Sequence, residues 1–303
     1  MTIYQNHNYH YSTNMDGIVI LDKDSGMFSR TAGHRITKIF GEKKFGHIGT
    51  LDPMATGVLV IAIGNATKMI PFVEDLNPDT KQYIFGVRFG VDSNTLDITG
   101  NIITDCGRIP TESDIKNILP SFIGEQMQVP PIYSAVHVGG MRAYDVARRG
   151  GAVDIPPRKI HIYELEYIGK SGESFQFRVT CSRGTYVRAI ARDIAKKLGT
   201  FAVADMIRRT KSGCFDVKSA VTLDFLENVV NNGGDIGKIL MPTDSGLGDI
   251  PVVNLDDKDT ELYVHGGFIN GTWEDGLRRI YNGDKFIGVG CVDGGILRPK
   301  RTI

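Results

Sequence analysis

The stretch from Phe45 to Lys68, FGHIGTLDPMATGVLVIAIGNATK, constrains the fold of this chain more than any other. It begins with small and polar residues, which are typical of a tight loop, and continues into an apolar run, Val58 to Ile63, that predicts a buried strand. One carboxylate, Asp52, lies in the loop directly before Pro53, and a residue that precedes proline is confined to extended conformations. The stretch therefore predicts a defined loop that presents Asp52 beside a buried strand.

A carboxylate in such a loop has two interpretations. Asp52 either caps a turn, with the glycines of the loop serving only close packing, or it is a catalytic group held on a rigid scaffold. Composition alone favours the turn. The identity of the whole string favours catalysis.

That string resembles the signature loop of the TruB family, the tRNA pseudouridine-55 synthases. The matching positions, at fixed spacing, are Gly46, His47, Gly49, Thr50, Leu51, Asp52, Pro53, Ala55, Gly57, Val58, Leu59, Gly64, Ala66, Thr67 and Lys68. The resemblance implies that Asp52 is the catalytic residue. It also implies that His47 fills the space that the target base leaves when it is extruded from the RNA.

Two further segments resemble motifs of the same family and complete a catalytic set. In KQYIFGVRFG, residues 81–90, alternating apolar side chains predict a strand, and Tyr83 matches the tyrosine that stacks on the target base. In CSRGTYVRAIARDIA, residues 181–195, Arg188 matches the arginine that pairs with the catalytic aspartate. Taken alone, Tyr83 is an ordinary strand aromatic and Arg188 is half of a structural salt bridge.

The resemblance extends to residues that would contact the RNA. Lys23 follows the first predicted strand, Asp97 lies in a polar loop, and Tyr133, Arg142 and Tyr144 belong to VPPIYSAVHVGGMRAYDVARRG, residues 129–150. Arginines and Tyr144 are interleaved in this last segment, as on surfaces that bind single-stranded RNA. A solvated helix face explains the same charges equally well.

The implied reaction is an isomerisation of one uridine in the T-loop of tRNA to pseudouridine. It needs a carboxylate beside the sugar and base, but no redox partner, so we expect no cofactor and no metal. Two alternatives stay open. One is a non-catalytic RNA-binding or tRNA-folding factor on the same scaffold. The other is a glycosidic-bond hydrolase, which would need a second carboxylate at a defined distance.

Charge and cysteine content limit the partners and the cellular compartment that the chain can have. The chain has 35 Lys and Arg against 35 Asp and Glu, so RNA binding requires a local concentration of positive charge. The four cysteines show no CxxC spacing, which favours a reducing compartment over a disulfide framework or a zinc site. Without a signal core or a long apolar run, the sequence predicts a cytoplasmic protein and no membrane partner. The resemblance implies that the partner is the tRNA T-arm, and we expect a monomer.

The predicted fold is α+β, a pseudouridine-synthase-like, mostly antiparallel sheet flanked by helices. We expect a flexible tail at 1–15, a catalytic domain at 16–249 and a small PUA-like β domain at 250–303. Ser29 is the expected cap of the first helix, Thr111 and Asp114 form an expected capping box, and 228–237 is an expected loop. Asn282–Gly283 predicts a hairpin turn in the last domain.

Overall fold

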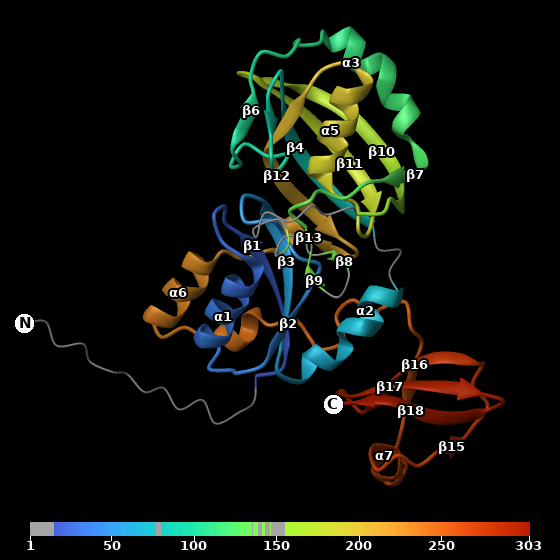
Figure 1. Ribbon diagram of the computed structural model, residues 1–303. Helices are drawn as coiled ribbons and strands as arrows, with labels where there is room; N and C mark the ends of the chain where they lie inside the picture. Colours follow the sequence, from blue (N-terminus) through green and yellow to red (C-terminus); the bar gives the residue numbers. More distant parts are fainter. Residues whose placement is uncertain (1–14, 77–79, 135, 139–140, 143–145, 147–154) are drawn as a thin grey trace, which may run out of the picture.

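A computed structural model describes residues 15–76, 80–134, 136–138, 141–142, 146 and 155–303 (Figure 1). The main sheet spans two halves of the molecule. Its strands, in spatial order, are β1 (Gly17–Lys23), β3 (Thr56–Ile63), β12 (Ala202–Ser212), β4 (Thr80–Phe89), β11 (Ser174–Ser182), β10 (Arg158–Ser171) and β7 (Gly124–Gln128). At the side of this path, β2 (Phe45–Ile48) pairs with β3, and β13 (Phe215–Asp216) pairs with β12.

The two halves of the sheet meet at one short parallel seam. Only β3 and β12 run parallel, with Arg208 opposite Thr56 and Arg209 opposite Gly57, while the other described neighbours in this sheet are antiparallel. Gly57 has φ +96°, and a Cβ there would lie 2.2 Å from the Arg209 carbonyl oxygen. A glycine is therefore required for β12 to approach β3 this closely.

The continuous apolar run of β3 is explained by burial on both faces. Leu59, Ile61 and Ile63 belong to the core that lies under the helices, whereas Val58 and Val60 belong to a second core on the opposite face. That second core includes Phe286 and Val289 from the C-terminal sheet. The strand is predicted correctly from its sequence because alternation is lost when both faces are covered.

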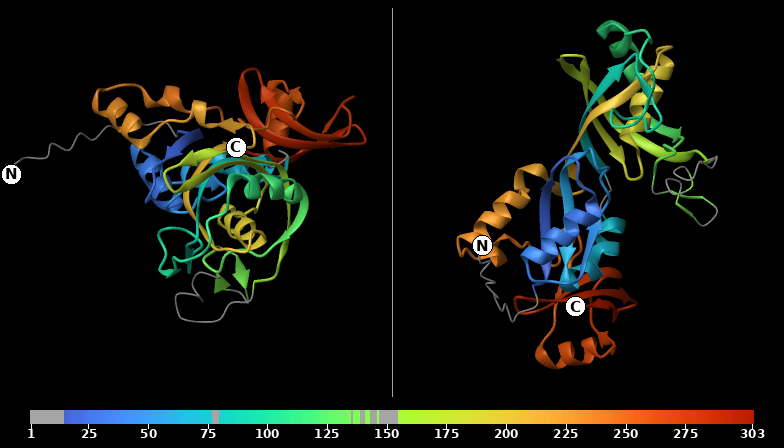
Figure 2. Two further views of the ribbon diagram at one scale, coloured as in Figure 1. Left: turned by 90° about the horizontal axis from the view of Figure 1, so that it is seen from above. Right: turned by 60° about the vertical axis from the view of Figure 1, so that its left-hand side comes forward.

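Helices flank both halves of the sheet (Figures 1 and 2). Their bounds are α1 (Ser29–Ile39), α2 (Ile70–Leu76), α3 (Glu112–Ile118), α5 (Val187–Lys197), α6 (Leu223–Asn231) and α7 (Asp257–Val264), with 3₁₀ turns η1 (Gly64–Met69), η2 (Leu119–Phe122), η3 (Val217–Ser219) and η4 (Ile236–Ile239). Small ladders pair β5 (Asp92–Ser93) with β6 (Ile102–Thr104) and β8 (His137–Val138) with β9 (Met141–Arg142). No helix within the described ranges is long and apolar enough to cross a membrane.

Two local expectations are wrong and one is confirmed. Ser29 does not cap α1, whose N-cap is Phe28 without a side-chain bond, because its hydroxyl bonds the main chain of Leu51 instead. The expected loop at 228–237 begins as helix, since α6 continues to Asn231 before η4. The capping box of Thr111 and Asp114 is present, with both reciprocal bonds formed.

A separate sheet forms the C-terminal lobe (Figure 2). Its order is β14 (Val252–Asn254), β16 (Gly276–Asn282), β17 (Lys285–Asp293), β18 (Ile296–Thr302) and β15 (Ile269–Asn270). The expected hairpin is confirmed, but its turn residues are Gly283 and Asp284, because Asn282 pairs with Lys285 as the last residue of β16; Gly283 has φ +56°. Asp244 accepts bonds from Arg279 at 2.8 Å and from the Tyr281 hydroxyl at 2.6 Å, which ties this lobe to the segment before it.

Candidate active site

A cavity of about 230 Å³ lies where the two halves of the main sheet meet. The loop between β2 and β3 forms one side of it, and β4 and the start of α5 form the others. The lining residues are Gly49, Thr50, Leu51, Asp52, Ala55, Lys81, Tyr83, Arg158, Gly184, Thr185, Tyr186, Val187 and Ile207. The cavity thus gathers two of the three expected catalytic residues, Asp52 and Tyr83, from distant parts of the sequence.

The third expected residue, Arg188, holds Asp52 in a two-pronged ion pair. The Arg188 Nε donates to Asp52 Oδ2 at 2.8 Å, and Nη2 donates to Oδ1 at 3.1 Å. The Arg188 side chain is 3% exposed and that of Asp52 is 36% exposed, so the cation lies behind the carboxylate, which faces the cavity. Such bidentate pairing fixes the plane of the carboxylate as well as its position.

Arg188 is itself fixed by a second set of acceptors. Its Nη1 donates to the Thr95 carbonyl at 2.6 Å and lies 3.5 Å from Asp97 Oδ2, and its Nη2 donates to the Tyr133 carbonyl at 2.9 Å. Asp97 is 5% exposed and also accepts bonds from Thr95 and Thr99. The structure therefore places Asp97 and the main chain of Tyr133 around Arg188.

Every carbonyl of the catalytic loop from Gly49 to Met54 is hydrogen-bonded, and five of them bond to another segment. Arg209 donates to those of Gly49 and Thr50, Ser29 to Leu51, Ala55 to Asp52, Lys23 and Gly26 to Pro53, and Ser25 to Met54. A surface loop usually leaves such groups to water. Here the donors come from β1, the turn after it, α1 and β12, so the loop is rigid because the surrounding fold holds it.

Three of these donors have positions that sequence reasoning missed. Arg209 is 0% exposed and also donates to the Val58 carbonyl at 2.7 Å. Ser29 both donates to and accepts from the main chain of Leu51. Neither position carries a local signal, because each depends on a contact far along the chain.

Lys23 is the third of these donors. Its side chain is 0% exposed, and its ammonium donates to the carbonyls of Asp24, Met27 and Pro53. Burial lowers the pKa of Lys23 to about 8. Because all three donors are engaged inside the protein, the described geometry gives Lys23 a supporting role for the loop and does not favour the expected RNA contact.

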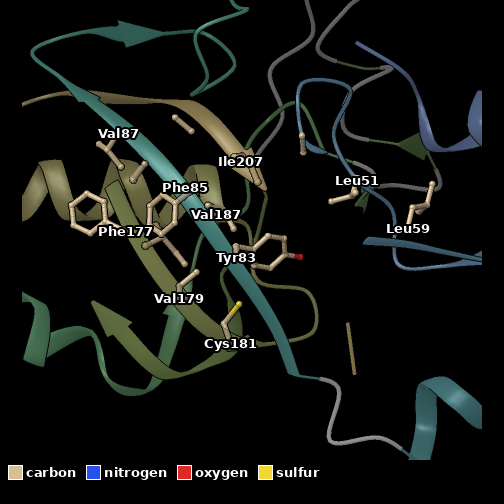
Figure 3. Close-up of a cluster of buried hydrophobic side chains, with 14 of the residues drawn as sticks. Leu51, Leu59, Tyr83, Phe85, Val87, Phe177, Val179, Cys181, Val187 and Ile207 are labelled. Atoms are coloured by element: carbon tan, nitrogen blue, oxygen red, sulfur yellow. The ribbon is translucent and has the colours of Figure 1, made fainter. Parts of the chain in front are cut away.

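Tyr83 ends a row of core side chains and turns its hydroxyl toward the catalytic loop. In Figure 3 its ring follows Phe85 along β4, and the hydroxyl points away from Phe177 to the side where Leu51 lies. Burial raises the pKa of Tyr83 to about 12, against the opposing influence of the Arg209 guanidinium. Tyr83 is therefore a neutral phenol at physiological pH, with a ring face for stacking and one proton to relay.

The other expected RNA contacts are more loosely placed. His47 lies in β2, and its buried Nδ1 has no partner among the described residues; burial lowers its pKa, so the ring is neutral near pH 7. The main chain of Arg142 lies in β9, whereas Tyr144 lies outside the described residues. Around the cavity and throughout the described ranges, no three His, Cys, Asp or Glu side chains are grouped to hold a metal.

The bond between Ser29 and Leu51 yields a first prediction. Replacing Ser29 with alanine removes both hydrogen bonds from a buried stretch of main chain, so we expect a loss of about 1–3 kcal/mol in the free energy of unfolding in urea. Ser25→Ala is the matched control, because this exposed hydroxyl makes one bond to the same loop. Equal stability of the two variants would contradict the importance of the Ser29 contact.

The fold is similar to those of two solved structures. A chain in a solved Cbf5–Nop10–Gar1 complex superimposes with a TM-score of 0.69 at 24% identity, over 95% of this chain and 85% of that one. A chain in the archaeal box H/ACA sRNP Nop10–Cbf5 complex gives 0.67 at 23% identity. These likenesses confirm the expected α+β fold.

The particular family follows from the sequence. The profile of "TruB family pseudouridylate synthase (N terminal domain)" matches residues 37–187, and two profiles of TruB C-terminal regions match 188–248 and 251–303. A tRNA pseudouridine synthase B from Gluconacetobacter diazotrophicus is 36% identical over 95% of this chain and 97% of its own. One from Caldanaerobacter subterraneus subsp. tengcongensis is 40% identical over 95% and 99%. This chain belongs to the TruB family of pseudouridylate synthases.

Proposed function

We propose that this protein converts one uridine in the T-loop of tRNA to pseudouridine, with Asp52 as the catalytic carboxylate. The observation that carries the proposal is the carboxylate itself, oriented by Arg188 on the wall of a cavity that also contains the Tyr83 ring. Both relatives described above are named tRNA pseudouridine synthase B, which supports tRNA as the substrate class. A base inside a folded loop must be extruded to reach such a cavity.

The residues have distinct tasks in this reaction. The bond between ribose C1′ and uracil N1 breaks, C1′ joins C5 instead, and the proton that leaves C5 is balanced by one gained at N1. Asp52 acts at the sugar or the base, and Arg188 keeps it oriented. Tyr83 stacks on the uracil, and its neutral hydroxyl relays the C5 proton.

The described structure does not favour glycoside hydrolysis. A hydrolase needs a second carboxylate across the scissile bond. Asp52 is the only carboxylate among the described residues that line the cavity, whereas Asp97 is 5% exposed and lies against Arg188. Unchanged RNA mass with altered base identity would support the isomerase, whereas released uracil would support a hydrolase.

The decisive experiment uses unmodified tRNA and an isolated T-arm stem-loop. After incubation with the protein, carbodiimide-dependent primer extension should show one pseudouridine in the T-loop of each RNA. Binding without modification would support the alternative of an RNA-binding or tRNA-folding factor.

We further propose that the enzyme acts as a cytoplasmic monomer with residues 250–303 as an RNA-binding domain. The four free cysteines support the reducing location, and the cavity, which residues of one chain line, supports the monomer.

Activity should be independent of divalent metal. The reaction requires no Lewis acid, and Asp52 is already paired with a cation of the protein. On a prefolded T-arm stem-loop, single-turnover rates with and without EDTA should agree within about twofold. A large loss in EDTA that returns with one added metal would contradict the proposed mechanism.

Tyr83→Phe should separate stacking from proton relay. The phenyl ring keeps the stacking surface, so RNA affinity should change by less than about threefold, while finished pseudouridine should fall by at least about a hundredfold because C5 keeps its proton. Because the pKa of Tyr83 is raised, the wild-type rate should not depend on ionisation of this phenol below about pH 10. Near-normal turnover of Tyr83→Phe would leave stacking as its task.

A further inference from the structure

The cavity has a second polar wall that the tasks assigned above do not use. It consists of Arg158 at the start of β10, Gly184 and Thr185 in the turn after β11, and Tyr186 just before α5. The guanidinium of Arg158 lies over the Tyr186 ring, with its carbon 4.5 Å from the ring centroid. Stacking of this kind holds the planar cation in one orientation.

Two polar atoms on this wall are buried without a partner among the described residues. They are Nε of Arg158 and Oγ1 of Thr185. A buried donor that makes no hydrogen bond is costly, and such atoms are rare in folded proteins. Two of them on one wall of one cavity indicate a site for a ligand that supplies acceptor oxygens.

The charge of the wall indicates that the ligand is an anion. Asp52 is already paired with Arg188, which also lies 3.5 Å from Asp97, whereas Arg158 forms no ion pair with any described carboxylate. Gly184, with φ +76°, places no side chain against the guanidinium, whereas a Cβ there would lie 3.5 Å from Nη1 of Arg158. The N-terminus of α5 has no side-chain cap and adds partial positive charge to the same wall.

We propose that Arg158 and Thr185 bind a phosphate that flanks the extruded uridine, as an anchor for the sugar during the isomerisation. This inference rests on the proposed function. Arginine offers the planar, two-pronged donor set that suits a phosphate, and the hydroxyl of Thr185 adds a third donor. Arg158 and Thr185 are therefore substrate-binding residues, distinct from the pair of Asp52 and Arg188.

An anchor on the phosphate has a specific use in this reaction. Once the bond from C1′ to N1 breaks, the uracil must rotate while the ribose stays beside Asp52. Contacts to the base cannot hold the ribose during this step, because the base is the part that moves. A phosphate held at the opposite wall keeps C1′ in place while the base turns, which is an orientation effect.

The test asks whether neutralising one phosphate of the RNA weakens binding as much as replacing Arg158 does. T-arm stem-loops carry one methylphosphonate, placed either 5′ or 3′ of the target uridine, and their dissociation constants are measured for wild type and Arg158→Gln at several salt concentrations. Arg158→Gln should bind the unmodified RNA at least about tenfold more weakly, with a salt slope smaller by about one. One of the two methylphosphonates should weaken wild type by a similar factor and Arg158→Gln by less than about twofold.

Matched variants separate this contact from general charge and from folding. Arg178→Gln makes the same substitution at an exposed arginine paired with Glu166 on the neighbouring strand, and it should bind like wild type. Thr185→Val should lose affinity and Thr185→Ser should regain it. If both methylphosphonates weaken wild type and Arg158→Gln equally, the proposal is wrong. If wild type forms no pseudouridine in the unmodified stem-loop, the proposed function is wrong instead.

Discussion

Asp52→Asn should bind the T-arm stem-loop within about twofold of wild type and form no detectable pseudouridine. Asparagine keeps the shape of the side chain, and RNA binding depends mainly on phosphate contacts and RNA shape. It removes the charge and nucleophilicity on which the chemistry depends, so we expect the single-turnover rate to fall by at least about three orders of magnitude.

The control for this variant is Asp24→Asn, which removes an exposed carboxylate from the neighbouring turn. It should retain wild-type rates. Circular dichroism should show that both variants are folded. Substantial turnover by a folded Asp52→Asn enzyme would overturn the assignment of the catalytic residue.

Arg188→Ala should lose both activity and stability. Removing this buried cation leaves the carbonyls of Thr95 and Tyr133 without their donor and Asp97 without its paired cation, so we expect a loss of about 3–5 kcal/mol in the free energy of unfolding. The rate should fall at least about a hundredfold, because Asp52 is no longer oriented. Arg188→Lys should recover only part of the rate, since an ammonium lacks the planar fork.

A double-mutant cycle tests whether the two residues act as a unit. Once Asp52→Asn has removed the carboxylate, adding Arg188→Lys should cost little further activity, and the coupling in unfolding free energy should be at least about 1 kcal/mol. Strict additivity of the two variants in both measurements would show that the ion pair is structural only.

The elements that the sequence predicts well have local causes. The buried strand β3, the strand with Tyr83, the helix with Arg188 and the hairpin at Asn282 follow from periodicity and turn residues that lie within a few positions of one another. The identities of the candidate catalytic residues came from the resemblance to a family. Composition alone predicted only that Asp52 lies in a turn or loop.

The features that were missed depend on contacts between distant positions. Arg209 is completely buried although it is charged, because the seam between β3 and β12 brings it under the catalytic loop. Ser29 lies where a helix cap is expected, but its partner Leu51 is 22 residues away. Propensities describe neighbours along the chain, and neither contact is visible at that range.

The six bonded carbonyls of the catalytic loop make activity a direct measure of how intact the fold is. Their donors come from β1, the turn after it, α1, β12 and the loop itself, so unravelling of any of these segments releases part of the loop. In most enzymes a mobile active-site loop loses its geometry before the core melts. Here the loop is held by the fold itself, so turnover should be lost when these segments unfold, and curves of activity and of secondary structure against urea should coincide.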